Sequence, residues 1–578
     1  MRLGLAVLAF VLLLLPLAVR TSWPWWALVA LVPVFIVLGV VHSRTERRQN
    51  RHRALREFHE GELARLEERW RLLPDDGADL SPRDARSAGR AGDLDLFGRA
   101  SLFQRLSRAQ TREGRRTLAR WLLHGAELPE IAARQAAVLE LAQKPLEREG
   151  LFAAARAGAT APLLDEVLIA FGERGAPLPF ARVLFVLAHV FPPLLGGAIA
   201  MYFFDLGASA LVIVALAQTI LVLACHGPVQ SRANQLASPD RALERYAAIF
   251  DRVAATRYDS PRLQAIQARL TAEGASASDR LRALRVLVER LETSRNPFFA
   301  LSIGPALLWD LHIVLRAERW RRSTGRHLRG WLEAVGELEA LASLGGLLAE
   351  GRASLPTLVE SEGRFSAVKL AHPLIDRSKA VGNDLTLGGP GSVLLLSGSN
   401  MSGKSTLLRS VGLAVVLAEA GGPVLAERLE LSRFSLWTSV RVADSLAEGA
   451  SHFYAELVRI KEVVDAARQE PRRILYLLDE MLHGTNSKER YVGAVSVIRW
   501  LSSQASVGIV TTHDLALAAV SGELPAGTVT QRHFGDEVVG DQIRFDYHLR
   551  EGPIQSTNAL RLMRAVGIDI ELSAPDPG

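Results

Sequence analysis

Four uncharged apolar runs divide the first half of this chain, with strongly charged stretches between them. They are Leu3–Val19, Trp23–Val41, Val183–Phe204 and Ala208–Cys225. Because each run approaches the length that a helix needs to cross a bilayer, the pattern predicts two membrane-spanning hairpins, at residues 1–43 and 183–225. A cleavable signal peptide would show a single apolar core, and burial inside a protein core is the alternative for the second pair.

Arginines gather at the outer ends of both predicted hairpins. They are Arg44, Arg47, Arg48, Arg51 and Arg53 after the first hairpin, Arg174 and Arg182 before the second, and Arg232 after it. Positive charge beside a span favours the cytoplasmic side of a membrane. We therefore expect a multi-pass protein of the cell membrane whose remaining parts lie in the cytoplasm.

The polar stretches have a helical period through most of the chain. Thr45–Leu73 predicts an amphipathic helix, and Pro74–Asp93, rich in Asp, Gly, Ser and Pro, predicts a linker, so residues 44–93 form a charged helix and linker. Residues 94–350 are helical in pattern on both sides of the second hairpin. They predict an all-helical domain interrupted by membrane helices.

From residue 363 onward the pattern changes to apolar runs of strand length separated by helices. The runs are Ser392–Leu396, Arg473–Leu478 and Val507–Thr511. This alternation indicates a parallel sheet covered by helices over residues 363–578. The predicted fold class is α plus α/β, with two transmembrane hairpins, a helical core domain and a C-terminal α/β domain.

Composition supports a membrane protein more than a nucleic-acid-binding one. The chain has 578 residues, of which 49% are hydrophobic, and a formal net charge of +6. Arginine beside membrane spans accounts for part of that charge, so the basic balance is weak evidence for nucleic acid. The single cysteine, Cys225, excludes an intrachain disulfide.

A phosphate-binding loop stands out in the C-terminal third. Residues 398–405 read G-S-N-M-S-G-K-S, between a predicted strand and a helix opening at residue 406. Backbone N–H groups of such a loop surround phosphates, while Lys404 would reach the β/γ oxygens and Ser405 would hold Mg²⁺. A chance glycine turn is the alternative. The residues expected to bind ATP are Gly398, Asn400, Met401, Ser402, Gly403, Lys404, Ser405 and Thr406.

Acidic residues and a histidine follow two other predicted strands. Asp479 and Glu480 end a buried strand, where Asp479 would hold Mg²⁺ and Glu480 would polarise the attacking water. His513 ends the strand at 507–511, at the edge where ligands of parallel sheets bind, so it would face the γ-phosphate. A capping or core role is the alternative for His513. The expected catalytic residues are thus Glu480, His513 and Lys404.

The order of motifs resembles the ATPase domain of the MutS mismatch-repair family, within the ABC ATPase group. The motifs are G-S-N-M-S-G-K-S-T, then D-S-L-A-E-G-A-S-H-F-Y-A-E-L, then L-L-D-E-M-L-H-G-T-N, then T-T-H-D-L. The resemblance covers about residues 94–170 and 235–570. It implies ATP and Mg²⁺ as cofactors and a homodimer in which Ser451 completes the partner's site. The family usually has Thr where His452 stands.

Departures from the family concern DNA. No segment before Leu94 is long enough for the family's mismatch-reading domain, and Arg232–Asn296 leaves little room for its clamp. Phosphate contact needs only a positive face, for which the helical domain offers Arg262, Arg280, Arg282 and Arg285. These arginines could equally belong to ordinary solvated helix faces. No base-reading element is visible in the sequence.

The two predicted hairpins and the resemblance together imply a membrane-anchored MutS-like ATPase that hydrolyses ATP at a dimeric composite site and binds DNA. One alternative is a membrane ATPase that couples nucleotide state to a protein partner. Another is an ABC-type transporter, but the predicted spans contain few polar residues beyond Gln218 and Thr219. A scaffold with structural ATP is disfavoured because Lys404, Asp479, Glu480 and His513 are all present.

Overall fold

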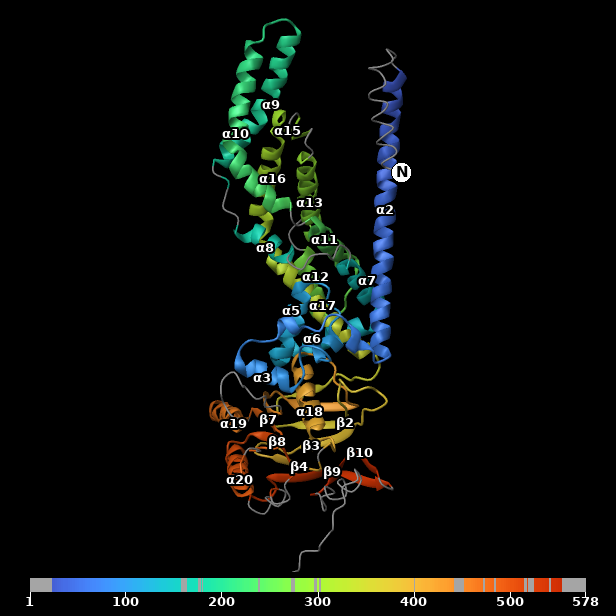
Figure 1. Ribbon diagram of the computed structural model, residues 1–578, viewed down its shortest axis with the longest axis vertical. Helices are drawn as coiled ribbons and strands as arrows, with labels where there is room; N and C mark the ends of the chain where they lie inside the picture. The colour runs from blue at the N-terminus through green and yellow to red at the C-terminus, as the bar shows by residue number, and fades with distance from the viewer. Residues whose placement is uncertain are drawn as a thin grey trace, which may run out of the picture.

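The computed structural model contains a long helical part and an α/β part at one end of it (Figure 1). The apolar core is continuous from one part to the other. The structure describes residues 23–156, 164–174, 178, 180–237, 240–271, 276–295, 299–300, 303–399, 401–440, 452–470, 473–482, 485–513, 517, 524–539 and 542–553.

Helix α2 (Trp23–Leu66) joins two segments that the sequence predicts separately, the apolar run 23–41 and the charged helix after it. The predicted end at Leu73 is wrong, because the helix stops at Leu66, Glu68 adopts a positive φ of 60°, and the 3-10 turn η1 (Trp70–Leu72) follows. The run Leu3–Val19 lies outside the described residues.

A buried ionic cluster fastens the end of α2 to the helical domain. Glu350 and Arg105 are joined by hydrogen bonds, one of 3.0 Å, and Arg108 lies 3.2 Å from the same carboxylate. Arg108 also contacts Glu62 of α2 at 2.7 Å. Burial and neighbouring arginines lower the pKa of Arg65, on the same helix, to about 9.

The segment Pro74–Asp93 differs from the linker that its composition predicts. It contains the 3-10 turn η2 (Ala78–Leu80) and helix α3 (Ala85–Asp93), which begins with Asp84 capping Ser87. Asp75 and Asp79 both pair with Arg115, at 2.8 and 2.6 Å. The acidic residues that suggest a solvated linker are therefore bound to a distant helix, a contact that local composition does not encode.

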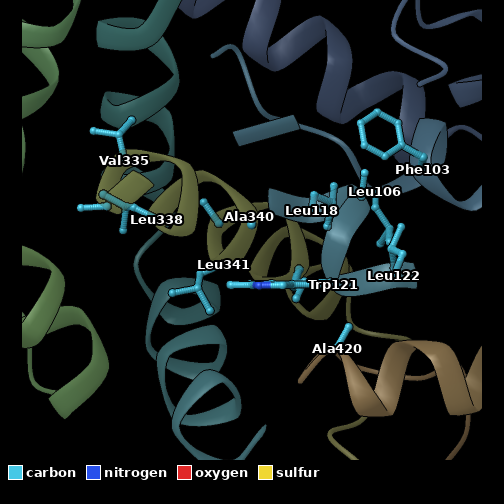
Figure 2. Close-up of a cluster of buried hydrophobic side chains, with 14 of the residues drawn as sticks. Phe103, Leu106, Leu118, Trp121, Leu122, Val335, Leu338, Ala340, Leu341 and Ala420 are labelled. Carbon is cyan, nitrogen blue, oxygen red and sulfur yellow. The ribbon is translucent and has the colours of Figure 1, made fainter. Parts of the chain in front are cut away.

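Helix α17 (Leu328–Ala349) runs through the centre of the helical domain and packs along α5 (Arg112–Leu123), and Figure 2 draws apolar side chains of both helices. Leu118, Trp121 and Leu122 pack there, and Ala420 brings the α/β domain to the same cluster. The remaining helices are α4 (Leu102–Leu106), α6 (Leu128–Gln143), α7 (Pro145–Arg156), α8 (Leu164–Arg174), α11 (Asp240–Ala255), α12 (Pro261–Thr271), α13 (Ala277–Ser294), α16 (Trp309–Thr324) and η3 (Gly325–His327).

Two helices of the described residues are long and apolar enough to cross a membrane, α9 (Ala181–Phe203) and α10 (Ser209–Ala237). They pack against each other and project away from the α/β domain, on the side where α2 also begins (Figure 1). Gln218, a polar residue inside α10, is buried, and its amide donates to the carbonyls of Pro305 and Ala306 in α15 (Ile303–Ala306) at 2.8 and 2.7 Å.

The main sheet of the α/β domain has six strands in the order β10-β9-β4-β8-β7-β6. The predicted strands are confirmed as β4 (Val393–Ser397), β7 (Ile474–Leu478) and β8 (Val507–Thr512), which are parallel. In this sheet β8 lies between β4 and β7. The other strands are β6 (Ser435–Ser439), β9 (Val529–Val539) and β10 (Gln542–Glu551).

A second sheet, which the sequence pattern did not reveal, has the order β1-β5-β2-β3. Its strands are β1 (Thr357–Val359), β2 (Phe365–Leu370), β3 (Asn383–Leu387) and β5 (Arg428–Ser432). Helices α18 (Lys404–Glu419), α19 (His452–Gln469) and α20 (Ser487–Ser503) complete the domain. The loop between β2 and β3 runs beside the main sheet and contributes to the cavity described next.

Candidate active site at the edge of the parallel sheet

A cavity of about 880 Å³ opens where β4 and β7 end. That volume suits a small-molecule or cofactor site. Its lining includes Lys404, Ser405, Asp479 and Glu480, so the structure brings together residues from two strands that are far apart in sequence. Met401, Gly403 and Thr406 also line the cavity.

The loop before α18 has the backbone conformation that its glycines permit. Gly403 has a φ of 109°, a region that side-chain-bearing residues rarely adopt, and a Cβ on Gly398 would lie 2.6 Å from Ser402 Oγ. Lys404 Nζ lies 2.9 Å from the carbonyl oxygens of Gly398 and Ser399, so its ammonium sits inside the loop. Asn400 lies outside the described residues.

The two acids after β7 lie beside that lysine. Glu480 Oε1 is 3.4 Å from Lys404 Nζ and 3.4 Å from His513 Nδ1. His513 reaches Glu480 because β8 lies next to β7. Glu480 has a φ of 48°, a backbone conformation that costs free energy for a non-glycine residue and that recurs at functional sites. The structure therefore brings Lys404, Glu480 and His513 together, as the sequence predicts.

Thr511 holds the two acids in place, and sequence reasoning did not single it out as a site residue. Its side chain is fully buried, its hydroxyl donates to Asp479 Oδ1, and it accepts a hydrogen bond of 3.0 Å from the Glu480 backbone N–H. A threonine at the end of an apolar strand carries no distinctive sequence signal. Only the strand register shows that it faces β7.

Other lining residues also come from segments that the sequence did not assign to the site. They are His372 and Val381 from the loop after β2, Glu456 of α19, and Tyr547 of β10. Burial and the nearby Arg409 lower the pKa of His372 to about 4, so the ring is neutral at physiological pH. His372 Nδ1 accepts a hydrogen bond of 3.2 Å from the backbone N–H of Leu374.

The segment in which Ser451 is expected to complete the partner's site lies largely outside the described residues. Ser451 is among those outside, and α19 begins at the next residue, His452. Within the segment 481–486 that follows the acids, Asn486 caps α20 by accepting from the Glu489 backbone N–H at 2.9 Å. The role of Ser451 stays a prediction.

The donor groups of the cavity fit a magnesium-bound triphosphate. The Ser405 hydroxyl and the Asp479 carboxylate are oxygen ligands of the kind that Mg²⁺ prefers. Among the described residues, no group of three or more His, Cys, Asp or Glu side chains is arranged so that it could hold a metal ion. In a usual Mg²⁺ site, one or two protein groups act with phosphate oxygens and water.

The fold and this site define a mixed helical and α/β protein whose parallel sheet ends in a phosphate-loop sequence and paired acids. Residues 394–572 match the family model of MutS domain V. The chain is 31% identical over 239 residues to the DNA mismatch repair protein MutS of Natronomonas pharaonis, covering 41% of this chain and 27% of that one. Residues 394–572 of this chain thus belong with domain V of the MutS family.

A second relative is the Endonuclease MutS2 of Geobacillus thermodenitrificans, 29% identical over 287 residues. That match covers 46% of this chain and 36% of the relative. The DNA mismatch repair protein MutS of Chloroflexus aurantiacus is 30% identical over 254 residues, or 26% of its length. The chain thus matches about a quarter to a third of each relative.

Proposed function

We propose that this chain binds and hydrolyses ATP with Mg²⁺ at the cavity beside β4 and β7. The observation that carries the proposal is that Lys404, Ser405, Asp479 and Glu480 line one cavity at the carboxyl edge of a parallel sheet. Ligands of open α/β sheets bind at that edge, and a phosphate loop at a helix N-terminus is an anion site.

Each residue has a distinct role in this proposal. Bound Mg-ATP supplies the phosphoanhydride bond whose cleavage is catalysed. Lys404 neutralises phosphate oxygens, while Ser405 and Asp479 hold the magnesium ion. Glu480 takes a proton from the attacking water, and His513, 3.4 Å from Glu480, orients that carboxylate toward the terminal phosphate.

We further propose that two copies of the chain pair through their α/β domains. Family resemblance is the support: the turn before α19 would bring Ser451 to the partner's nucleotide. A helix N-terminus carries free N–H groups that favour an anion, so α19 is suited to that position. His452, beside Ser451, would then lie at the interface between the two copies.

Attachment to a membrane by α2 and the α9–α10 hairpin is part of the same proposal. Large apolar side chains of the hairpin are exposed, among them Phe203 at 79% and Leu223 at 69%. Soluble proteins rarely leave a continuous surface of this kind uncovered. At 1.5 Å per residue, the 23 residues of α9 span about 34 Å, which exceeds the hydrocarbon thickness of a bilayer.

DNA is a proposed partner on the strength of family membership. The arginines noted in the helical domain are engaged with acids: Arg262 pairs with Glu130 at 2.9 Å, and Arg282 pairs with Asp251 and Asp279. Such pairing reduces the positive field available to a phosphate backbone. A protein partner near the membrane is therefore the second candidate for what the ATPase drives.

The proposal is tested with the full chain purified in detergent. We expect Mg²⁺-dependent ATP hydrolysis that Lys404→Ala abolishes. We also expect ATP to increase the dimer fraction of a hydrolysis-deficient Glu480→Gln variant in light scattering. Absence of nucleotide binding by the wild type would refute the ATPase assignment.

Two further measurements test the membrane and DNA parts separately. The chain should remain with membranes after alkaline carbonate extraction, and release into the soluble fraction would refute anchoring. Binding to homoduplex, mismatched and branched DNA across a salt series should weaken as salt rises if phosphates are contacted. No binding to any of them would remove DNA and favour the protein partner.

A further inference from the structure

The loop that joins β2 to β3, residues 371–382, forms one wall of the cavity. Ile375, Ala380 and Val381 of this loop line the cavity, and Lys404 and Ser405 at the start of α18 line the same cavity. Phosphates require the N–H groups and charge of the loop before α18, whereas these apolar side chains suit the planar base and the sugar. The wall 371–382 therefore determines how the uncharged part of a nucleotide fits.

Both ends of this wall are fixed within the α/β domain. At its start, the Ala371 backbone N–H donates to the Leu425 carbonyl at 2.8 Å. Just after its end, the Asn383 amide donates to the Tyr547 carbonyl at 3.0 Å and accepts from the Leu549 N–H at 2.8 Å. Contacts at the ends alone leave the middle of a loop of this length many conformations.

The middle of the wall is held by residues that directly follow α2. Arg71 Nη1 lies 2.6 Å from Asp376 Oδ1, and Arg71 Nη2 donates to the Leu374 carbonyl at 2.6 Å. Glu68 Oε1 accepts from the Arg377 backbone N–H and lies 3.3 Å from its Nε. Glu68 is the residue with a φ of 60°, so the chain leaves the helix in a conformation that presents it to the wall.

We propose that Glu68 and Arg71 are positioning residues of the nucleotide site, which set the wall 371–382 and join it to α2. This inference rests on the proposed ATPase function and adds residues from a segment that precedes the helical domain. Since α2 runs from this contact to the end of the molecule where α9 and α10 lie (Figure 1), the wall is directly linked to the apolar end of the protein.

The contact of Glu68 and Arg71 with the wall 371–382 couples α2 and the nucleotide cavity in both directions. If nucleotide binding favours one position of the wall, a constraint on α2 that favours the same position must increase nucleotide affinity by an equal factor. The contact consists of four charged side chains and two backbone groups, so it can separate and re-form without disturbing the apolar core. Nucleotide affinity should therefore depend on Arg71 and Glu68, while the chemistry of Lys404 and Glu480 should not.

The test measures binding of a fluorescent ATP analogue and steady-state hydrolysis with the full chain in detergent. Arg71→Ala and Asp376→Ala should each raise Kd and KM about five- to tenfold, as expected for loss of one charge-assisted hydrogen bond, with kcat within about twofold. The double variant should be no worse than Arg71→Ala alone, because that substitution already removes the contact with Asp376.

A matched control is available two residues away. Arg69 contacts Glu67 of its own segment, with Nε 2.8 Å from the carboxylate, so Arg69→Ala should leave Kd and KM unchanged. Arg71→Lys, which keeps the charge, should restore part of the affinity and guards against misfolding of the alanine variant. Wild-type Kd and KM in Arg71→Ala and Asp376→Ala would overturn this inference alone. No nucleotide binding by the wild type would overturn it together with the proposed function.

Discussion

Lys404 and Glu480 form an ion pair across the candidate site, with Nζ 3.4 Å from Oε1. The lysine opens α18 and the glutamate follows β7, so the contact exists only when the six-stranded sheet is assembled. Only 4% of the Lys404 surface is exposed, so its charge lies away from bulk water. Phosphoryl transfer uses positive groups at the phosphates and a residue that orients the attacking water, and this edge of the sheet carries a lysine and a carboxylate suited to those two roles.

Glu480→Gln should separate binding from hydrolysis. The amide keeps the size of the side chain but cannot accept a proton, so kcat should fall about 100-fold or more while ATP affinity stays within a few-fold. Phosphate release and equilibrium binding of the analogue measure the two quantities. Glu470→Gln, an exposed change at the end of α19, is the control. Turnover near the wild-type rate would show that Glu480 is not the base.

Thr511→Val should impair hydrolysis through the acids that Thr511 holds. Valine has nearly the same shape but lacks the hydroxyl that bonds Asp479 and the Glu480 backbone, so kcat should fall about tenfold or more. Thr511→Ser keeps the hydroxyl and should retain most activity. Comparison of kcat and thermal stability of the two variants distinguishes lost positioning from general unfolding. Equal activity of the valine and serine variants would contradict this role.

Glu350→Gln should destabilise the base of α2. The glutamate side chain is 5% exposed and contacts Arg105 and Arg108, which are 4% and 5% exposed. The change therefore removes the carboxylate that pairs with buried Arg105 and leaves Arg108 with Glu62 alone. Breaking a buried pair in this way costs about 3–5 kcal/mol of unfolding free energy. Denaturant unfolding of the detergent-solubilised chain measures it.

A surface pair provides the comparison for that variant. Glu551 contacts Arg532 at 3.0 Å but is 85% exposed, so Glu551→Gln should change stability by less than about 1 kcal/mol. If both variants lost the same small amount, the buried cluster would not be a stabilising element of the fold.

Stability should fall as pH rises through neutrality because of Glu419. Burial raises the pKa of this carboxyl, at the end of α18, to about 7 in the folded protein, whereas an unfolded glutamate titrates near 4.5. The folded state therefore holds a proton that the unfolded state has lost, so this group's contribution is complete below about 4.5 and is lost as pH passes 7.

Glu419→Gln removes that titration. Glutamine can still accept the hydrogen bond that the Phe434 N–H donates to Glu419 Oε1 at 2.9 Å. The variant should match the wild type near pH 5 and exceed its unfolding free energy near pH 8 by roughly 1–3 kcal/mol. Thermal unfolding at the two pH values is the measurement. A wild-type advantage at pH 8 would contradict the protonated, buried carboxyl.

How far the site could be foreseen differs from one residue to the next. Lys404, Asp479, Glu480 and His513 follow from local motifs, because each motif combines a strand with the residues at its carboxyl end. Thr511 could not be foreseen, since its role depends on the register between β7 and β8.

The sequence by itself determined part of the fold and its motifs: the apolar helices α9 and α10, the phosphate-loop sequence, the strands β4, β7 and β8, and the acids that follow β7. These are set by local periodicity and by short motifs, which need no distant partner. Tertiary structure alone decided that β8 lies between β4 and β7 and that Arg71 pairs with Asp376. It also decided that residues 74–93 contain the turn η2 and the helix α3 where composition predicts a linker. Such contacts join residues far apart in the chain, and the free energy that selects them comes from burial and pairing in the assembled protein.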